Sequence, residues 1–255
     1  MSIHIKNEIE LNIMRRAGKV LAEIMREIGG QVRPGVSTIE IDKLAEELVL
    51  KAGGNPAFKG YGGGKNPFPA TICASINDEI VHGIPSEDKI LKNGDIFKID
   101  IGIEIEGFYS DMARTFAVGE ISDEAQKLIE VTEKCFWKGI KNLKAGSTLS
   151  QYCKNAQKVA EDAGFSVVKN LVGHGIGKNL HEDPQVPNYF EKGFRDLVLE
   201  EGMTLALEPM VNIGTHLTVM SPDGWAYLTA DRKLSAHYEN TILITKNGVE
   251  VLTAF

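Results

Sequence analysis

The clearest hydrophobic pattern in the chain is an alternation of apolar and polar positions between residues 95 and 105. Every second residue is apolar, and these residues are Phe97, Ile99, Ile101 and Ile103. A period of two predicts a β-strand with one buried face. The pair Glu106-Gly107 predicts a turn, after which the chain returns as a second strand from Phe108 to Thr115.

Two aspartates lie on this predicted hairpin, one on each strand. If the turn is centred between residues 105 and 106, Asp100 and Asp111 face each other with Cβ atoms roughly 4.5–5.5 Å apart. Like charges in directly opposite positions destabilise a sheet. Two explanations are open: the register differs by one residue and both carboxylates are solvated, or a cation lies between them.

Helical spacing of apolar residues appears in two separate parts of the chain. The predicted helices cover residues 8–28, 37–52, 122–143 and 148–163. The second begins at Ser37-Thr38-Ile39-Glu40, which has capping-box spacing, and Thr148 is expected to cap the fourth. Gly35 and Gly146, which lie in turns before a helix, are 111 positions apart. The glycines that end these helices, Gly53 and Gly164, have the same separation, so the helical pairs are expected to be related.

A second internal match leads to acidic residues. Leu91–Gly94 resembles Leu199–Gly202 at a separation of 108 residues, and each segment precedes an alternating strand. Asp100 lies six residues after Gly94, and Glu208 lies six residues after Gly202. The chain is therefore expected to contain two copies of a helix–turn–helix–loop–strand unit, whose strands join into one sheet about a pseudo-two-fold axis.

Further candidate residues lie in or beside other apolar strands. His174 is flanked by glycines in Gly173–Gly177, which oppose a helix and allow close approach of the backbone. Glu208 ends an apolar strand, and Glu239 shares the face of another strand with His237. A carboxylate in such a strand is unfavourable unless it is paired or bound to a metal.

Together these residues form an oxygen-rich donor set with one imidazole, consisting of Asp100, Asp111, His174, Glu208 and Glu239. Such a set suits Mn, Fe(II), Co or Zn. Four carboxylates balance the charge of two divalent ions, as a buried cluster requires. Two such ions activate a water molecule and hold a substrate oxygen, and aminopeptidases are among the enzymes with sites of this kind.

The composition excludes several classes of protein. The chain has 255 residues, of which 43% are hydrophobic, so it can bury a sizeable core. A net charge of −7 without a Lys/Arg block argues against nucleic-acid binding. The apolar runs are too short for a membrane span, and the charged first residues are not a signal peptide. The cysteines, Cys73, Cys135 and Cys153, lack metal-site spacing and indicate a reduced, cytoplasmic protein.

Several motifs in this order resemble the type I methionine aminopeptidases. They are Asp100 and Asp111 with ten residues between them, Gly173–Gly177, His181-Glu182, Leu207-Glu208-Pro209 and Tyr238-Glu239-Asn240-Thr241. The resemblance spans nearly the whole chain. It implies the pita-bread fold, an α/β (α+β) architecture in which two pseudo-symmetric halves share a mainly antiparallel sheet with helices on its outer face. It also implies that residues 1–255 form a single catalytic domain.

The resemblance implies roles for individual residues. The metal ligands would be Asp100, Asp111, His174, Glu208 and Glu239. Asp111 and Glu239 would bridge the metals, and Glu208 would also act catalytically as a proton shuttle. His82 and His181 would be catalytic and substrate-binding residues that contact the scissile peptide or its tetrahedral intermediate. The methionine pocket would be walled by Phe58, Phe68, Cys73 and Trp225.

Some positions differ from the pattern expected for the family. His237 stands in place of Gln and Asn240 in place of His, and both flank a ligand, where they would change the groups that orient it. Leu180 stands in place of an aromatic residue and would make the pocket roomier. The Gly- and Pro-rich segment 55–69, which contains Tyr61 between two phenylalanines, is predicted to be a loop at the surface or at a pocket.

The implied function is metal-dependent removal of the initiator methionine from nascent proteins and peptides when the second residue is small. Two divalent ions, Co, Mn, Fe(II) or Zn, are the expected cofactors. The expected partner is the N-terminal peptide of nascent chains, with the ribosome as a further candidate. A cytoplasmic monomer is expected, with no nucleic-acid-binding motif and no membrane contact.

Two alternatives to this function are open. A proline-directed aminopeptidase or dipeptidase of the same fold usually has an additional N-terminal domain, whereas this chain is expected to begin with the catalytic unit. A non-catalytic binding protein of the same fold typically loses metal ligands, and all five are present in this sequence.

Overall fold

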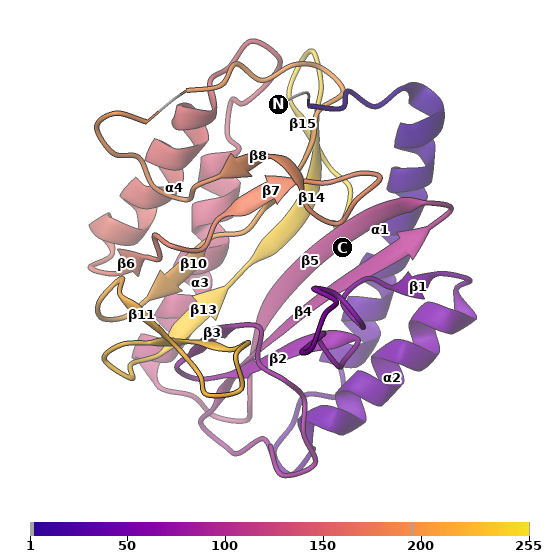
Figure 1. The fold of residues 1–255 in the computed structure, drawn as a ribbon. Helices are drawn as coiled ribbons and strands as arrows, with labels where there is room; N and C mark the ends of the chain where they lie inside the picture. The colour runs from indigo at the N-terminus through magenta and orange to yellow at the C-terminus, as the bar shows by residue number, and fades with distance from the viewer. Residues whose placement is uncertain (1–2, 195, 255) are drawn as a thin grey trace.

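The computed structural model describes residues 3–194 and 196–254 (Figure 1). The N-terminal half contains α1 (Glu8–Gly29), α2 (Thr38–Lys51), β1 (Asn55–Pro56), β2 (Ile72–Ile76), β3 (Glu79–Val81), β4 (Ile96–Ile105) and β5 (Phe108–Ala117). The C-terminal half contains α3 (Asp123–Gly139), α4 (Leu149–Asp162), β6 (Ser166–Val167), β7 (Gly173–Gly175), β8 (Glu182–Val186), β9 (Thr204–Leu207), β10 (Met210–Asn212), β11 (Thr218–Met220), β12 (Tyr227–Thr229), β13 (Ser235–His237), β14 (Glu239–Ile244) and β15 (Val249–Val251).

The predicted helices are present, and each half contributes one pair. The third helix ends at Gly139 rather than at Leu143, because the chain turns before Asn142, whose φ of +67° is outside the helical region. Within the described ranges, no helix combines the length and the hydrophobicity that crossing a membrane requires.

The two halves share one sheet. Within the described residues this sheet has nine strands, with β1-β4-β5-β14-β9-β7-β8 in order and with β2 and β15 paired to β4 and β14. The halves join where β14 pairs with β5, and these pairings are antiparallel. This arrangement confirms the predicted fold of two halves with a common, mainly antiparallel sheet.

Each half packs its helices on its own strands, so the sheet is covered by two hydrophobic clusters. In the first cluster, α1 and α2 contact the apolar face of β4, which consists of Phe97, Ile99, Ile101 and Ile103. In the second cluster, α3 and α4 pack on β9 and β14. The polar face of β4 is also buried, since Lys98 is 1% exposed and Asp100 is 8% exposed. The site therefore lies inside the protein, on the face of β4 that points away from the helices.

The register of the β4–β5 hairpin differs from the prediction. Asp100 is paired with Ala113 and Asp111 with Gly102, so the two aspartates are not directly opposite. The turn is centred between Glu106 and Gly107, both of which have positive φ angles, as a two-residue hairpin turn of this hand requires. The partner of Asp100 is thus two residues farther along β5 than predicted, and a shift of two residues keeps both carboxylates on the same face.

The caps of the second and fourth helices form in different ways. The Glu40 carboxylate accepts a hydrogen bond of 2.8 Å from the backbone N–H of Ser37, as the capping-box spacing predicts. Thr148 is the N-cap residue of α4, as predicted, but its side chain accepts no backbone hydrogen bond. The carboxylate of Asp196 instead accepts from the backbone N–H of Ser150 at 3.0 Å.

Candidate metal centre

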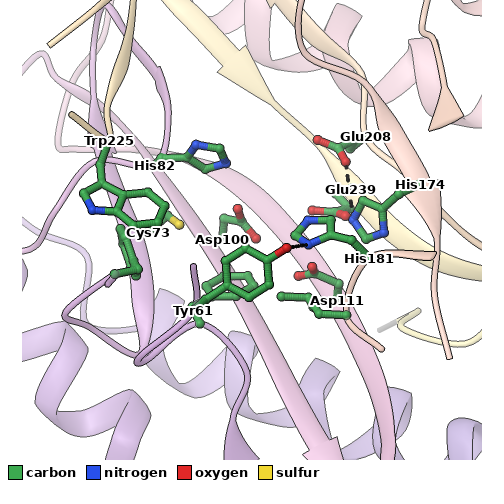
Figure 2. A pocket seen from close by; sticks show the side chains of 13 residues that line it. Tyr61, Cys73, His82, Asp100, Asp111, His174, His181, Glu208, Trp225 and Glu239 are labelled. Atoms are coloured by element: carbon green, nitrogen blue, oxygen red, sulfur yellow. Dashed lines mark hydrogen bonds and ion pairs between the residues drawn. The ribbon is translucent and has the colours of Figure 1, made fainter. Parts of the chain in front are cut away.

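A cavity of about 100 Å³ lies on the buried polar face of the sheet, between the two halves (Figure 2). Its wall consists of Phe58, Tyr61, Phe68, Cys73, His82, Asp100, Asp111, His174, Leu180, His181, Glu208, Trp225 and Glu239. Every site residue named from the sequence is in this wall. The fold thus brings together side chains that are up to 181 positions apart in the chain, from Phe58 to Glu239.

Neighbouring strands of the sheet each supply one candidate ligand. Asp100 is in β4, Asp111 is in β5, Glu239 begins β14, Glu208 directly follows β9, and His174 is in β7. These strands are consecutive in the sheet, in the order β4-β5-β14-β9-β7. Because alternate residues of a strand share a face, the pairing of these strands directs the side chains to one place.

Two overlapping groups of side chains have the spacing of a metal site. Atoms of Asp100, His237 and Glu239 lie within 4.8 Å of one another, and so do atoms of Asp111, His174 and Glu239. Glu239 belongs to both groups, as a bridging ligand would. Glu208 lies beside them, with Oε1 at 3.7 Å from His174 Nε2 and Oε2 at 3.8 Å from His237 Nε2.

The buried carboxylates lack partners that would balance their charge. Within the described residues, Asp100 Oδ1, Asp111 Oδ1 and Glu239 Oε1 accept no hydrogen bond. Burial raises the pKa of Asp100 to about 7. Burial, with the charges of neighbouring carboxylates, also raises the pKa values of Asp111, Glu208 and Glu239 well above their ordinary range. At neutral pH this cluster therefore requires either protons or bound cations.

The imidazoles of the site are neutral at neutral pH. Burial lowers the pKa values of His174 and His237 to about 3. Nδ1 of His174 lies 2.8 Å from the carbonyl oxygen of Gly175, which can only accept a hydrogen bond. Nδ1 therefore carries the proton, and Nε2 keeps a free electron pair on the side of the carboxylates.

This arrangement fits divalent metal ions. Unpaired carboxylate oxygens and a free imidazole nitrogen converge in a buried space, and one carboxylate is shared by both groups. His237 was not predicted as a ligand, but its ring nitrogens have no hydrogen-bond partner in the described structure, so it adds a second imidazole to the donor set. Cys73 lies in the same wall but belongs to neither of the two groups.

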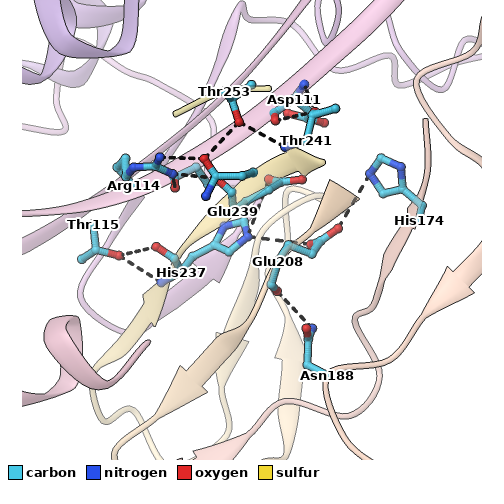
Figure 3. A network of polar contacts seen from close by, with 12 residues as sticks. Asp111, Arg114, Thr115, His174, Asn188, Glu208, His237, Glu239, Thr241 and Thr253 are labelled. Atoms are coloured by element: carbon cyan, nitrogen blue, oxygen red, sulfur yellow. Dashed lines mark hydrogen bonds and ion pairs between the residues drawn. The ribbon is translucent and has the colours of Figure 1, made fainter. Parts of the chain in front are cut away.

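A polar network behind the candidate ligands fixes their backbone (Figure 3). Arg114 donates to the carbonyl oxygen of Glu239 at 2.6 Å and to the side-chain oxygen of Asn240 at 2.8 Å. Thr241 exchanges two hydrogen bonds of 2.9 Å with the backbone of Asp111. Asn240, which departs from the family pattern, is therefore part of the network that orients β14.

The outer part of the cavity is aromatic. The rings of Phe68 and Trp225 meet edge to face with centroids 5.2 Å apart, and the ring of His82 lies 6.5 Å from that of Trp225. Burial lowers the pKa of His82 to about 4, so its imidazole is neutral above pH 5. The outer part of the cavity is thus an apolar pocket that lies next to a cluster of charged groups.

Tyr61 lies in the wall of the cavity, in the loop that was predicted to lie at the surface or at a pocket, but its contact with His181 was not predicted. Its hydroxyl oxygen lies 2.6 Å from Nδ1 of His181, and the two rings are in edge contact. Tyr61 lies between Phe58 and Phe68 in the Gly-rich segment, and of these three the family resemblance assigns only the two phenylalanines to the methionine pocket. Leu180 was named only as a departure from the family, and it also lies in the wall.

Comparisons with known proteins identify the family to which the chain belongs. The model of metallopeptidase family M24 matches residues 12–246. A methionine aminopeptidase of Clostridium perfringens is 49% identical over 98% of each chain. The crystal structure of methionine aminopeptidase from Thermotoga maritima superposes with a TM-score of 0.95 and 42% identity over the whole of both chains. A prolidase from Pyrococcus furiosus shares the fold, with a TM-score of 0.78 and 24% identity, but this chain covers 65% of it.

The chain belongs to metallopeptidase family M24, whose members are metal-dependent hydrolases. Its relatives of similar length place it among the methionine aminopeptidases of that family, and not among the prolidases. The chain is therefore a metallo-aminopeptidase with the pita-bread fold.

Proposed function

We propose that this protein removes the N-terminal initiator methionine from peptides and nascent proteins whose second residue is small. The observation that carries the proposal is the convergence of five candidate metal ligands, each in or directly after one of five consecutive strands, at the base of a small aromatic pocket. A site of this kind holds one apolar side chain next to the bond that is hydrolysed.

Two divalent ions would be held by Asp100, Asp111, His174, Glu208 and Glu239. Co, Mn, Fe(II) and Zn suit this donor set. When bound, such ions act as Lewis acids and supply a nucleophile at neutral pH. The shared position of Glu239 supports a bridging role, and Asp111 is proposed as the second bridge.

The remaining steps belong to side chains of the protein. Glu208 is proposed to accept a proton from the attacking water and to pass it to the leaving amine, since its carboxylate lines the cavity, with Oε1 at 3.7 Å from His174 Nε2. His82 and His181 line the same cavity with neutral imidazoles, which are proposed to donate hydrogen bonds to the peptide oxygen as negative charge develops there.

Selectivity for methionine is proposed to come from the pocket that Phe58, Phe68, Cys73 and Trp225 form. A thioether is flexible and polarizable, so it packs well against aromatic rings. The small volume of the cavity supports a single side chain as its occupant. A small second residue is proposed because its side chain would lie at the mouth of the pocket beside Tyr61 and His181.

We also infer the setting in which the protein acts. Residues 1–255 are proposed to form a single catalytic domain that works as a monomer in the cytoplasm. The proposed partner is the N-terminal peptide of a nascent chain, and the ribosome is the place where the protein would meet it.

Product analysis with a pair of peptides tests this proposal. The Mn²⁺-loaded protein is expected to release methionine from Met-Ala-Ser and to leave a peptide with a second-position proline, Ala-Pro-Ser, largely intact. Cleavage of Ala-Pro-Ser or Leu-Ala-Ser as fast as Met-Ala-Ser would show that the pocket does not select methionine.

A further inference from the structure

A fully buried lysine lies outside the chemistry described above. Lys98 is in β4, two residues before Asp100 and on the same face, and it is 1% exposed. Burying an amino group is unfavourable unless its N–H groups find acceptors. A β-branched aliphatic side chain would suit a strand position without this requirement. The presence of a lysine there therefore requires an explanation.

The amino group of Lys98 joins the backbones of the two halves. Nζ donates to the carbonyl oxygen of Asn77 at 2.7 Å and to that of Ser235 at 3.0 Å. The backbone N–H of Ser235 also donates to the Asn77 carbonyl at 3.1 Å. Asn77 lies in the turn between β2 and β3, and Ser235 begins β13, so three segments meet at this amino group. In Figure 1, β13 runs next to β3, and residue contacts also connect β13 with β4.

All three segments lead directly into the candidate metal centre. Asn77 precedes His82 by five residues, through β3, and Ser235 precedes Glu239 by four residues, through β13. The side chain of Asn77 is itself bound to the start of β4, where it accepts from the backbone N–H of Ile96 at 3.0 Å. A displacement of Ser235 relative to β4 would thus change the position of Glu239 relative to Asp100.

We propose that Lys98 is a positioning residue whose amino group sets the separation of Asp100, Glu239 and His82. The expected effect on metal affinity follows from geometry alone, whereas the expected effect on catalysis rests on the proposed function.

Two simpler roles of Lys98 lead to different expectations. A lysine that acted only through its charge would repel cations, so removing it would strengthen metal binding. A lysine that only stabilised the fold would change the unfolding temperature without changing metal affinity.

The test uses Lys98→Met, which keeps the length of the side chain and removes its hydrogen-bond donors. Calorimetric titration with Mn²⁺ is expected to show about tenfold weaker binding than the wild-type protein, comparable to the loss of a group that orients a ligand. For Met-Ala-Ser, kcat is expected to fall about tenfold, with KM changed less than about threefold. Lys127→Met is the matched control, because Lys127 also donates to a backbone carbonyl, that of Ala163, but lies outside the cavity.

A second variant keeps the test decisive if Lys98→Met does not fold. Lys98→Ala leaves space for a small amine, and 50–100 mM propylamine is expected to restore part of the Mn²⁺ affinity. Tetramethylammonium chloride at the same concentration matches the ionic strength but has no N–H donor. It is expected to restore nothing.

Three results would overturn the positioning role. The first is an Mn²⁺ affinity of Lys98→Met equal to that of the wild type, and the second is tighter Mn²⁺ binding by this variant. The third is an Mn²⁺ affinity of Lys98→Ala that propylamine and tetramethylammonium change to the same extent. The first result would make Lys98 a structural residue even if the unfolding temperature fell. A wild-type protein that bound Mn²⁺ but did not cleave Met-Ala-Ser would contradict the proposed function instead, and the affinity comparison would still decide the role of Lys98.

Discussion

Asp100 and Asp111 are diagonal neighbours across the β4–β5 hairpin, with Asp100 paired to Ala113 and Asp111 paired to Gly102. The Cα atoms of diagonal neighbours on one face are about 7–8 Å apart, farther than those of directly opposite residues, and two carboxylate side chains can span this distance to reach a common cation. Gly102 has no side chain at this point, and a Cβ atom there would lie 3.0 Å from the ring of Phe58. The hairpin therefore provides two candidate metal ligands on one face and space for a pocket wall.

Replacement of Asp111 by asparagine tests the bridging role. Asp111→Asn replaces a carboxyl group whose charged form is disfavoured by burial and by neighbouring carboxylates, so the metal-free variant is expected to unfold at an equal or higher temperature than the wild type. Metal affinity and activity with Met-Ala-Ser are expected to fall by at least about 10²-fold, since a lost ligand should matter at least as much as a lost supporting group.

Metal analysis and initial rates at limiting Mn²⁺ check this prediction. Asp162→Asn, at the exposed end of α4, removes the same charge far from the cavity and serves as the control. Near-normal activity of Asp111→Asn at limiting metal would exclude a bridging ligand.

The affinity for Mn²⁺ is expected to rise with pH between about 6 and 8. Metal ligands bind as carboxylates, and the pKa of Asp100 is raised to about 7, so protons compete with the metal below that pH. The shift is upward, so the competition weakens as pH rises and ends above about pH 8 for this group. Titrations in two buffers with different ionisation enthalpies would measure the proton release. Binding without proton release at pH 6.5 would contradict the raised pKa.

His82 is expected to act on the substrate without holding metal. His82→Ala should keep its Mn²⁺ affinity and fold but lose about 10²–10³-fold in kcat, the usual effect of removing one donor to a developing anion. KM should change much less, because the contact strengthens in the transition state. Because the pKa of His82 is about 4, its loss should not change the pH profile above pH 6. Loss of metal in proportion to activity would make His82 a ligand or a structural residue.

The Tyr61 hydroxyl is expected to hold the ring of His181 in its working orientation. Tyr61→Phe removes one hydrogen bond of 2.6 Å and leaves the aromatic ring in place. A loss of roughly 2–10-fold in kcat is expected, since a single hydrogen bond contributes about 0.5–1.5 kcal/mol. Steady-state kinetics with Met-Ala-Ser would measure it, with Tyr189→Phe, outside the cavity, as the control. Unchanged kcat would mean that His181 does not depend on this contact.

Most residues of the candidate site lie in segments where apolar residues recur with a regular period. The secondary structure of these segments could therefore be predicted from the sequence. The alternation around Asp100 predicted β4, and the matched positions of Asp100 and Glu208 predicted two halves that share a sheet. The register could not be predicted, because the pattern does not show which two residues adopt positive φ angles. A non-glycine residue, Glu106, is one of them.

Other features depend on contacts between distant segments. The polar face of β4 resembles a solvent-exposed face in the sequence, yet strands of the C-terminal half cover it and bury Lys98. Tyr61 lies in a glycine-rich loop in which apolar residues do not recur with a regular period. The local sequence pattern therefore could not predict its contact with His181. His237 shares a face with Glu239, as the sequence indicates, but it joins the donor set only because β13 also lies next to β4, which carries Asp100.

Titration of the metal-free protein with Mn²⁺ tests the central claim most directly, with hydrolysis of Met-Ala-Ser followed at each addition. No turnover is expected before metal is added. Activity is expected to rise with bound metal to a plateau at two equivalents or fewer, and to be lost on chelation. Full turnover by rigorously metal-free protein, or metal binding that leaves Met-Ala-Ser intact, would contradict it.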